Sequence, residues 1–236
     1  MSLPMYKYPV YSMTLPSTKK VIKYRPFLVK DEKNLLLAQQ SEDEMNMLDT
    51  LKIVVKDCIL DKAVNVEDLP IFDLEYLFAI IRSKSVGEDV TLIFTCKNQE
   101  CKQKTNITFR IDPKLIIPEG HTNKIELFDD VGVVMKYPNA ELMKQIEKIQ
   151  PKDAEGVIDL IVKSIDYIYD KESVYRANEQ TQAELIQFVE NLPKKPTENI
   201  KKFFTTSPRL EQKVEYVCPH CQTENEYIIE GIDSFF

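Results

Sequence analysis

Four of the five cysteines in this 236-residue sequence occur as two closely spaced pairs. The first pair is Cys96 and Cys101, and the second is Cys218 and Cys221, within the sequence CPHC. Apolar and polar residues alternate on both sides of each pair, as in "TLIF" and "TNITF" around the first and "KVEYV" and "NEYIIE" around the second. This period of two predicts that each pair lies at the tip of a β-hairpin.

Two such cysteine knuckles supply the four thiolates that a tetrahedral Zn²⁺ site requires. The sequence therefore predicts a zinc-ribbon-like pair of hairpins with Cys96, Cys101, Cys218 and Cys221 as the metal ligands. Four protein ligands leave no coordination position for a substrate, so the predicted metal is structural. Because the two knuckles are far apart in the sequence, the metal would also close a long loop of chain and add its binding free energy to folding.

Other interpretations of these cysteines stay open. An iron ion or an iron–sulfur cluster uses the same four ligands. A redox dithiol at Cys218 and Cys221 would resemble a thioredoxin-type CxxC, although that motif belongs to a βαβ context. His220 could replace a cysteine as ligand, but we expect it to point away from the knuckle.

Two further residues of chemical interest have simpler expected roles. Cys58 falls on the apolar stripe of a predicted helix and is expected to be a small buried hydrophobic residue. His121, in the loop "PEGHTN", is expected to be solvated. With two histidines, neither beside a candidate nucleophile, the sequence offers no catalytic set, and we expect no enzymatic activity.

The periodicity divides the chain into four parts with an α+β organisation. Residues 1–27 are expected to be an extended arm, either two short strands around the turn Pro16-Ser17-Thr18 or a segment with no core of its own. Residues 28–87 form a helical block. It includes a helix over 41–60, opened by a capping box from Ser41 to Glu44, and a buried helix over 71–85.

The second half combines the cysteine hairpins with more helices. Residues 88–138 and 207–236 are predicted to form one β module, with a hairpin over 89–112 and further strands at 124–128 and 132–138. Residues 139–206 are predicted to be an inserted helical block. Its helices are expected at 139–149, 152–169 and 181–192, with a short one around "TENIKKFF".

Composition and charge exclude several classes of protein. A net charge of −7 argues against a dedicated nucleic-acid-binding protein, which needs a basic surface. The charge is uneven, since residues 1–40 carry seven basic and two acidic residues, whereas residues 41–90 carry five and twelve. Such asymmetry suits an assembly with oppositely charged neighbours. The sequence shows no signal peptide or membrane helix, so synthesis in the cytosol without stable disulfides is expected.

Several motifs together resemble a known family. An N-terminal "STKKVIKYRPF" leads into the helix start "KDEKNLLLA", and a cysteine-bearing hairpin, a helical middle, a late "CPHC" and the ending "GIDSFF" follow. This combination resembles the baseplate hub subunit and hub-assembly family of T-even-type contractile-tailed phages. The resemblance spans nearly the whole chain. The first knuckle departs from the family pattern, because four residues rather than two separate its cysteines.

The resemblance implies a structural component of the baseplate hub, located in the virion tail, assembled in the host cytoplasm and acting through contacts with other hub and tail proteins. An alternative is a hub assembly factor that is absent from the mature particle. A third interpretation, from the knuckles alone, is a zinc-ribbon adaptor or nucleic-acid-binding protein, with Lys97, Lys102 and Lys104 around the first knuckle.

Aromatic residues near both ends are candidate contact elements. The N-terminal ones can add to a neighbouring protein or pack on their own domain; they are Tyr6, Tyr8, Tyr11, Tyr24 and Phe27. Phe235 and Phe236 are expected to dock into a pocket, either in this chain or in a partner.

Overall fold

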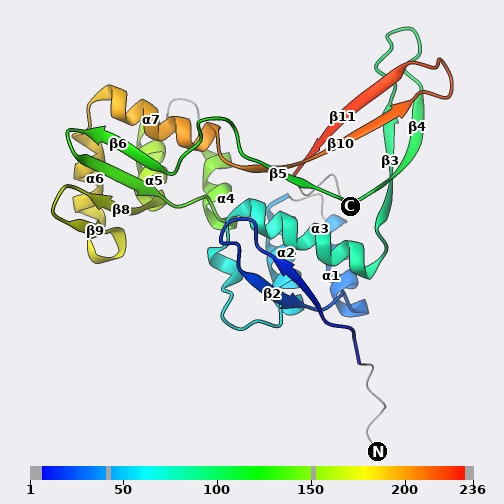
Figure 1. Cartoon of the computed structure of the whole chain (residues 1–236), viewed down its shortest axis with the longest axis horizontal. Coiled ribbons are helices and arrows are strands. Elements are labelled where there is room, and N and C mark those ends of the chain that lie inside the picture. Colours follow the sequence, from blue (N-terminus) through cyan, green and yellow to red (C-terminus); the bar gives the residue numbers. More distant parts are fainter. Residues whose placement is uncertain (1–6, 41–43, 150–152, 232–236) are drawn as a thin grey trace, which may run out of the picture. The chain divides into compact units, whose positions relative to one another are not determined.

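The computed structural model describes residues 7–40, 44–149 and 153–231, which fold into two compact units of helices and strands (Figure 1). Unit 1 contains the chain up to Val66, Phe72–Ile116 and the chain from Arg209 onward, and unit 2 contains Glu67–Ile71 and Ile117–Pro208. The chain is a mixture of helices and strands, which agrees with the predicted α+β class. In the part of the chain that the structure describes, no helix is long and apolar enough to cross a membrane.

The N-terminal hairpin of unit 1 consists of β1 (Tyr11–Thr14) and β2 (Val21–Tyr24), which pair antiparallel. Its turn contains Pro16–Thr18, as in the first of the two predicted alternatives. Alternate residues of the strands point into unit 1, so Met13, Ile22 and Tyr24 are buried. The arm is thus packed on its own unit by one face. Tyr6, Phe235 and Phe236 lie outside the described residues.

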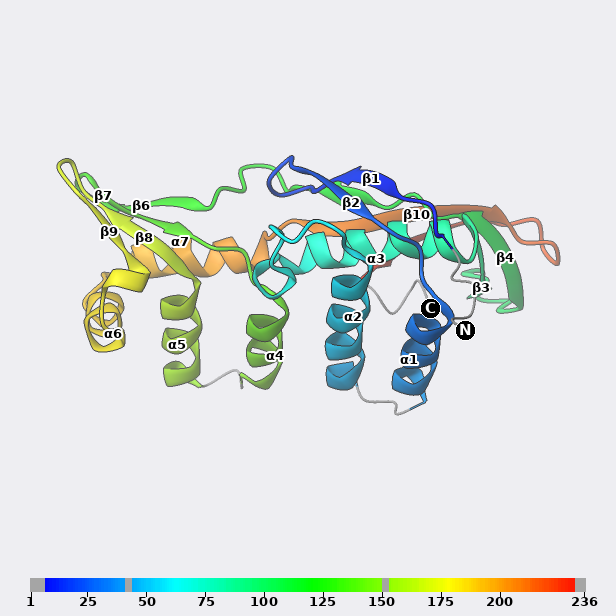
Figure 2. The ribbon, with the colours of Figure 1, turned by 90° about the horizontal axis from the view of Figure 1, so that it is seen from below.

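Helices make up most of the remaining core of unit 1. They are α1 (Val29–Gln39), α2 (Glu44–Cys58) and α3 (Ile71–Ser85), with a short 3₁₀ helix, η1 (Val66–Asp68), before α3. The apolar stripe predicted for α2 is buried, including Cys58, which is 0% exposed. Figure 2 shows α1 and α2 side by side. The predicted capping residue Ser41 lies outside the described residues. The bounds of α3 and its burial agree with the prediction.

Asp73 is a buried carboxylate in the first turn of α3, and it fastens the β1–β2 turn to this helix. Its side chain accepts a hydrogen bond from the backbone N–H of Ser17 at 3.0 Å and another from the Ser17 hydroxyl. Burial raises the pKa of Asp73 above its usual value, although the bonds from Ser17 oppose this shift.

Asp73→Asn is expected to gain stability relative to wild type as the pH rises. Because the pKa of Asp73 is higher in the folded than in the unfolded protein, its contribution to stability is present at acidic pH and lost as the pH rises through the folded pKa. Asparagine can keep both contacts with Ser17 and does not ionise. Chemical denaturation at ~pH 4 and ~pH 7 measures the difference. A difference between variant and wild type that does not change with pH would contradict the prediction.

The cysteine-bearing hairpins form the other half of unit 1. The first pairs β3 (Asp89–Thr95) with β4 (Lys104–Arg110), and the second pairs β10 (Arg209–Val217) with β11 (Glu224–Glu230). A short strand that the sequence did not predict, β5 (Lys114–Ile116), extends the second hairpin by pairing with β10. In Figure 1 the two hairpins meet at their turn ends. Apolar and aromatic side chains between them form one cluster, in which Phe94 contacts Tyr216 and Tyr227.

Unit 2 is built on a four-stranded antiparallel sheet. The strand order is β6 (Lys124–Phe128), β7 (Val131–Met135), β8 (Ile165–Tyr169) and β9 (Val174–Arg176). Its helices are α4 (Ala140–Lys148), α5 (Ala154–Ser164), η2 (Ala177–Glu179), α6 (Gln182–Glu190) and α7 (Lys194–Thr205). Residues of the sheet, α5, α6 and α7 share one core (Figure 2). Thr181 and Glu184 form a capping box at the start of α6.

Two predictions about this region were wrong. The strands β6 and β7 were assigned to the cysteine module, but β7 pairs with β6 and β8, and both strands belong to unit 2. The long segment of unit 2 therefore starts at Ile117 rather than at 139. The helix predicted over 152–169 ends at Ser164, and the chain continues as β8. The β-branched and aromatic residues of "IDYIY" favour a strand once β7 and β9 lie on either side.

Candidate metal centre

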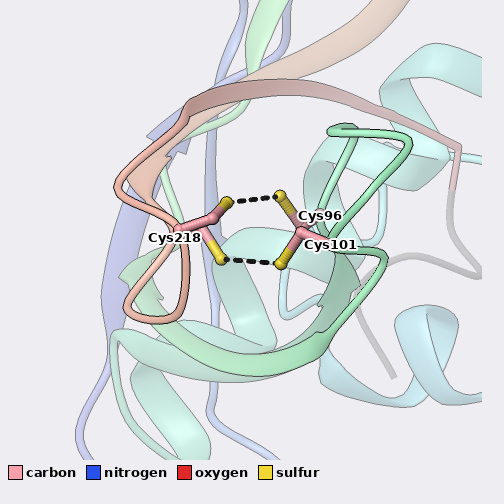
Figure 3. Close-up of side chains that lie close together, drawn as sticks. Cys96, Cys101 and Cys218 are labelled. Carbon is pink, nitrogen blue, oxygen red and sulfur yellow. Dashed lines mark hydrogen bonds between the residues drawn. The ribbon is translucent and has the colours of Figure 1, made fainter.

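The four predicted ligands converge at one point between the hairpin tips. The sulfur atoms of Cys96, Cys101, Cys218 and Cys221 all lie within 4.8 Å of one another. Figure 3 shows Cys96 and Cys101 of the first hairpin facing Cys218 of the second. The Sγ atoms of Cys96 and Cys221 are 3.6 Å apart, and those of Cys101 and Cys218 are 3.8 Å apart. These separations are far longer than a disulfide bond, and all four cysteines are free.

The dimensions of the cluster fit a single tetrahedral ion. Zinc–sulfur bonds of about 2.3 Å place the four sulfurs of a regular tetrahedron about 3.8 Å apart. Both measured sulfur–sulfur distances agree with that value. Cys96 and Cys218 are almost fully buried, whereas Cys101 and Cys221 are half-buried. The protein therefore presents a ligand set of the size and shape that Zn²⁺ needs.

Both knuckles are shaped by the same backbone hydrogen bonds. The N–H of Cys96 donates to the carbonyl of Gln103, and that of Cys218 donates to the carbonyl of Thr223, both at 2.9 Å. In each case the acceptor lies two residues after the second cysteine. The residue between, Lys102 or Gln222, adopts a left-handed conformation with φ of 48° or 59°.

The four-residue spacing of the first knuckle does not disturb this geometry. The N–H of Lys102 donates to the carbonyl of Asn98, four residues earlier, just as that of Gln222 donates to the carbonyl of Cys218. The final turns of the two knuckles are thus equivalent. The extra two residues of the first knuckle precede its turn, so Cys96 and Cys101 still meet the second pair.

Asn225 holds the two knuckles together beneath the sulfur atoms. This buried side chain accepts a hydrogen bond from the backbone N–H of Lys97 at 2.8 Å and donates to the carbonyl of Thr223 at 2.9 Å. Its amide also lies 3.7 Å from the sulfur of Cys96, towards which it donates. Asn225 therefore positions ligands on both hairpins, a role that no sequence pattern indicated.

The hydroxyl and backbone N–H of Thr223 act on the second knuckle. They lower the pKa of Cys221 below its usual value, because hydrogen bonds to the sulfur favour the thiolate. The Thr223 hydroxyl lies 3.3 Å from this sulfur. Thiolates are the form in which cysteines bind metals, so the surroundings of Cys221 are suited to a ligand.

Asn225→Ala is expected to weaken metal binding by about 10–100-fold, the usual effect of removing a partner that orients metal ligands. The substitution removes the bonds to Lys97 and Thr223 but leaves all four cysteines in place. Competition with a chromophoric chelator measures the affinity. Asn106→Ala, at an exposed position of β4, serves as the control and should bind as wild type does. Unchanged affinity in Asn225→Ala would contradict the positioning role.

The histidines lie apart from the sulfur cluster. His220 is exposed, and the metal-ligand cluster consists of the four cysteines without it. His121 is not the solvated loop residue that was predicted. Its ring is half-buried and packs on Tyr137 and Phe203, which also contact each other. Its two nitrogens contact the hydroxyls of Thr206 and Tyr137 at 2.9 and 3.1 Å. Burial lowers the pKa of His121 below its usual value.

Comparison with known proteins assigns the chain to a family. A family model described as "T4 bacteriophage base plate protein" matches residues 8–236. Neither a search of curated proteins nor a search of solved structures found a match. The matched range includes the described residues of both units from Tyr8 onward, and both cysteine hairpins. The chain therefore belongs to the T4 bacteriophage base plate protein family, whose place is in the phage tail.

Proposed function

We propose that this protein is a structural component of the baseplate hub of a contractile phage tail. It acts through contacts with other hub and tail proteins, without enzymatic activity, and a structural Zn²⁺ stabilises it. The observation that carries this proposal is the family match over residues 8–236, which covers nearly the whole chain. The motifs "STKKVIKYRPF" and "CPHC", which resemble those of hub proteins, support placing it in the hub.

The sulfur geometry favours a single ion over an iron–sulfur cluster. A cluster of several irons interposes its own sulfides between the cysteines, whereas here all four sulfurs lie within 4.8 Å. The hairpin context also differs from the βαβ context of a thioredoxin-type dithiol. When bound, Zn²⁺ would join the two hairpins through Cys96, Cys101, Cys218 and Cys221. Elemental analysis of the purified protein distinguishes zinc from a single iron.

The surroundings of the knuckles favour a protein-binding role over nucleic-acid binding. The ammonium group of Lys97 lies over the ring of Tyr227, at 4.6 Å from its centre, and donates to the backbone carbonyl of Glu226. This basic residue is therefore engaged within the protein. The neighbouring outer face of β10 and β11 carries Glu215, Glu224 and Glu226. Negative charge at this position disfavours contact with phosphates.

Quantitative mass spectrometry of purified tails and of hub precursors from the host cytoplasm tests the proposal. A few copies per finished tail, in fixed ratio to known hub proteins, is the expected result. Detection in hub precursors but not in finished tails would overturn the structural role and identify an assembly factor. Detection in finished tails but away from hub subcomplexes would refute the hub placement alone. Absence from all these particles would refute the whole proposal.

A further inference from the structure

Unit 2 carries an exposed apolar groove where the ends of its strands meet α6. The groove has a volume of about 300 Å³, and seven of its ten lining residues are apolar or aromatic. Phe128 of β6 and Tyr175 of β9 line it while remaining 43% and 42% exposed. Large side chains that are this exposed and adjacent to one another are typical of a binding surface.

Acidic residues surround this groove. Asp170 and Glu184 line it directly. The segments that form it, residues 128–131 and 169–190, contain seven carboxylates and two basic residues. One of the two basic residues, Lys171, already pairs with Asp130. A partner for this surface, here called the acidic groove, should therefore combine apolar and basic side chains.

The outward face of the β1–β2 hairpin has that composition. Val21 is 64% exposed, and Lys23 lies on the same face of β2, opposite Ser12 of β1. Val10, which is 53% exposed, directly precedes β1. Lys20 is exposed next to Val21. We call this surface the basic face. It differs from the inward face of the hairpin, which is buried in unit 1.

The positive charge of the basic face is not neutralised locally. Residues 7–30 contain no Asp or Glu. The basic residues nearest the following helix are paired, Arg25 with Asp31 and Lys30 with Asp57. Lys20 and Lys23, by contrast, form no ion pair with any other described residue. Their charge is available to a partner.

We propose that the basic face of one copy of this protein docks in the acidic groove of a second copy. The apolar groove would receive the exposed valines, and Lys20 and Lys23 would face the surrounding carboxylates. The edge of the sheet suits a hairpin partner, because β9 pairs with β8 on one side and Tyr175 of β9 also lines the groove. This inference goes beyond the hub placement and does not depend on it.

The geometry of such a contact has a consequence for assembly. Two different surfaces of the same chain are used, so the contact is head-to-tail rather than two-fold symmetric. Head-to-tail contacts propagate until they close as a ring or remain open as a chain. The purified full-length protein should therefore form oligomers larger than a monomer as its concentration rises.

Sedimentation of the purified protein over a range of concentrations tests the docking. We expect association at ~50 mM salt that weakens at ~500 mM, because salt screens the contacts between exposed charges. A protein that stays monomeric at every concentration overturns the proposal. So does self-association that is insensitive to salt.

Charge reversal identifies the two surfaces. Lys20→Glu with Lys23→Glu reverses the basic face, and Glu172→Lys with Glu179→Lys reverses exposed positions around the groove. Each double variant should associate at least ~10-fold more weakly than wild type, because like charges then face each other. A one-to-one mixture of the two should associate again into alternating oligomers. The reversed face of one fits the reversed groove of the other, and the unchanged basic and acidic surfaces also match.

A matched control separates these effects from the change in net charge. Lys62→Glu with Lys201→Glu makes the same charge change as Lys20→Glu with Lys23→Glu, but at exposed positions outside both surfaces, and this variant should associate as wild type does. Far-UV circular dichroism checks that every variant is folded. Failure of the mixture to associate, or equal weakening in the control, would show that other surfaces mediate self-association and would overturn the proposal.

Discussion

Replacing Cys218 by serine is expected to abolish stoichiometric metal binding and to destabilise unit 1. Cys218 is fully buried, and its sulfur is 3.8 Å from that of Cys101 on the other hairpin. A serine hydroxyl is not a thiolate, so three ligands remain and Cys221 alone would join the second hairpin to the ion. Because metal binding free energy is also folding free energy, the loss should be a large fraction of the about 5–15 kcal/mol that stabilises a domain.

The effect should be confined to one unit. Unit 2 contains none of the ligands and has its own core of sheet and helix residues. Limited proteolysis of Cys218→Ser should therefore cut within residues 72–116 and from 209 onward, while fragments of 117–208 persist. A strong chelator added to the wild-type protein should reproduce the same pattern, since it removes the metal without changing a residue.

Cys58→Ala is the matched control for loss of a cysteine. Cys58 is as buried as Cys218, but it belongs to the core beside α2 and not to the sulfur cluster. This variant should lose about 1–2 kcal/mol through the cavity it creates and should still bind one metal ion per chain. Elemental analysis and chemical denaturation measure both quantities. A Cys218→Ser protein that lacks metal but is as stable as wild type would show that the metal does not stabilise the fold.

The cysteine hairpins were predictable because their determinants are local. Alternating residues define each strand, and a short loop between two cysteines defines each tip. The convergence of all four sulfurs followed from the coordination chemistry of a single ion and from no other feature of the sequence. The buried helix α3 was also predictable, since residues 71–81 contain only two charged side chains, Asp73 and Glu75.

The boundary between α5 and β8 was not predictable in the same way. The segment "GVIDLIVKSIDYIY" contains no glycine or proline after its first residue, so nothing in it signals that the helix ends at Ser164. The strand exists because β7 and β9 supply hydrogen-bonding partners on both sides. Tertiary pairing overrides local propensity here. Long-range pairing is also the reason why β6 and β7 belong to unit 2 and not to the predicted cysteine module.

Side-chain contacts between residues that are far apart in the sequence could not be predicted either. Asn225 contacts Lys97 across 128 positions, and His121 contacts Thr206 across 85. Neither spacing corresponds to the period of a helix, a strand or a turn, so neither contact could be recognised in the sequence. Asparagine after a knuckle is common in turns, and a histidine in a polar loop is ordinarily solvated, so composition favoured the simpler role in each case.

Arg25 and Asp31 form a buried ion pair that should dominate the electrostatics of unit 1. Both side chains are about 95% buried or more, and Nη1 of Arg25 lies 2.6 Å from Oδ2 of Asp31. The same carboxylate oxygen accepts the backbone N–H of Leu28 at 2.8 Å, at the start of α1. Cys58 lies beside the pair, with its sulfur 3.5 Å from Nη1 of Arg25. Burial raises the pKa of Cys58 to about 12, so it stays a neutral thiol.

Arg25→Met is expected to cost about 3–5 kcal/mol of unfolding free energy, because it leaves the Asp31 carboxylate buried without its counter-ion. The exposed pair of Lys30 and Asp57 has the same separation, 2.6 Å, but its side chains are 60% and 46% exposed. Lys30→Met should therefore cost less than ~1 kcal/mol. The two variants compare a buried with an exposed ion pair at equal distance, within one unit of one protein.

A double variant separates the loss of the ion pair from the cost of leaving one charged partner buried without the other. Arg25→Met with Asp31→Leu removes both charges, so it should be more stable than Arg25→Met alone, even though it lacks two side chains instead of one. The bond to Leu28 is also lost in the double variant, which limits the recovery. Urea denaturation at neutral pH measures all three proteins. Equal costs for Arg25→Met and Lys30→Met would show that burial does not control the energetics of this pair. A double variant less stable than Arg25→Met would show instead that the carboxylate contributes mainly through its bond to the helix.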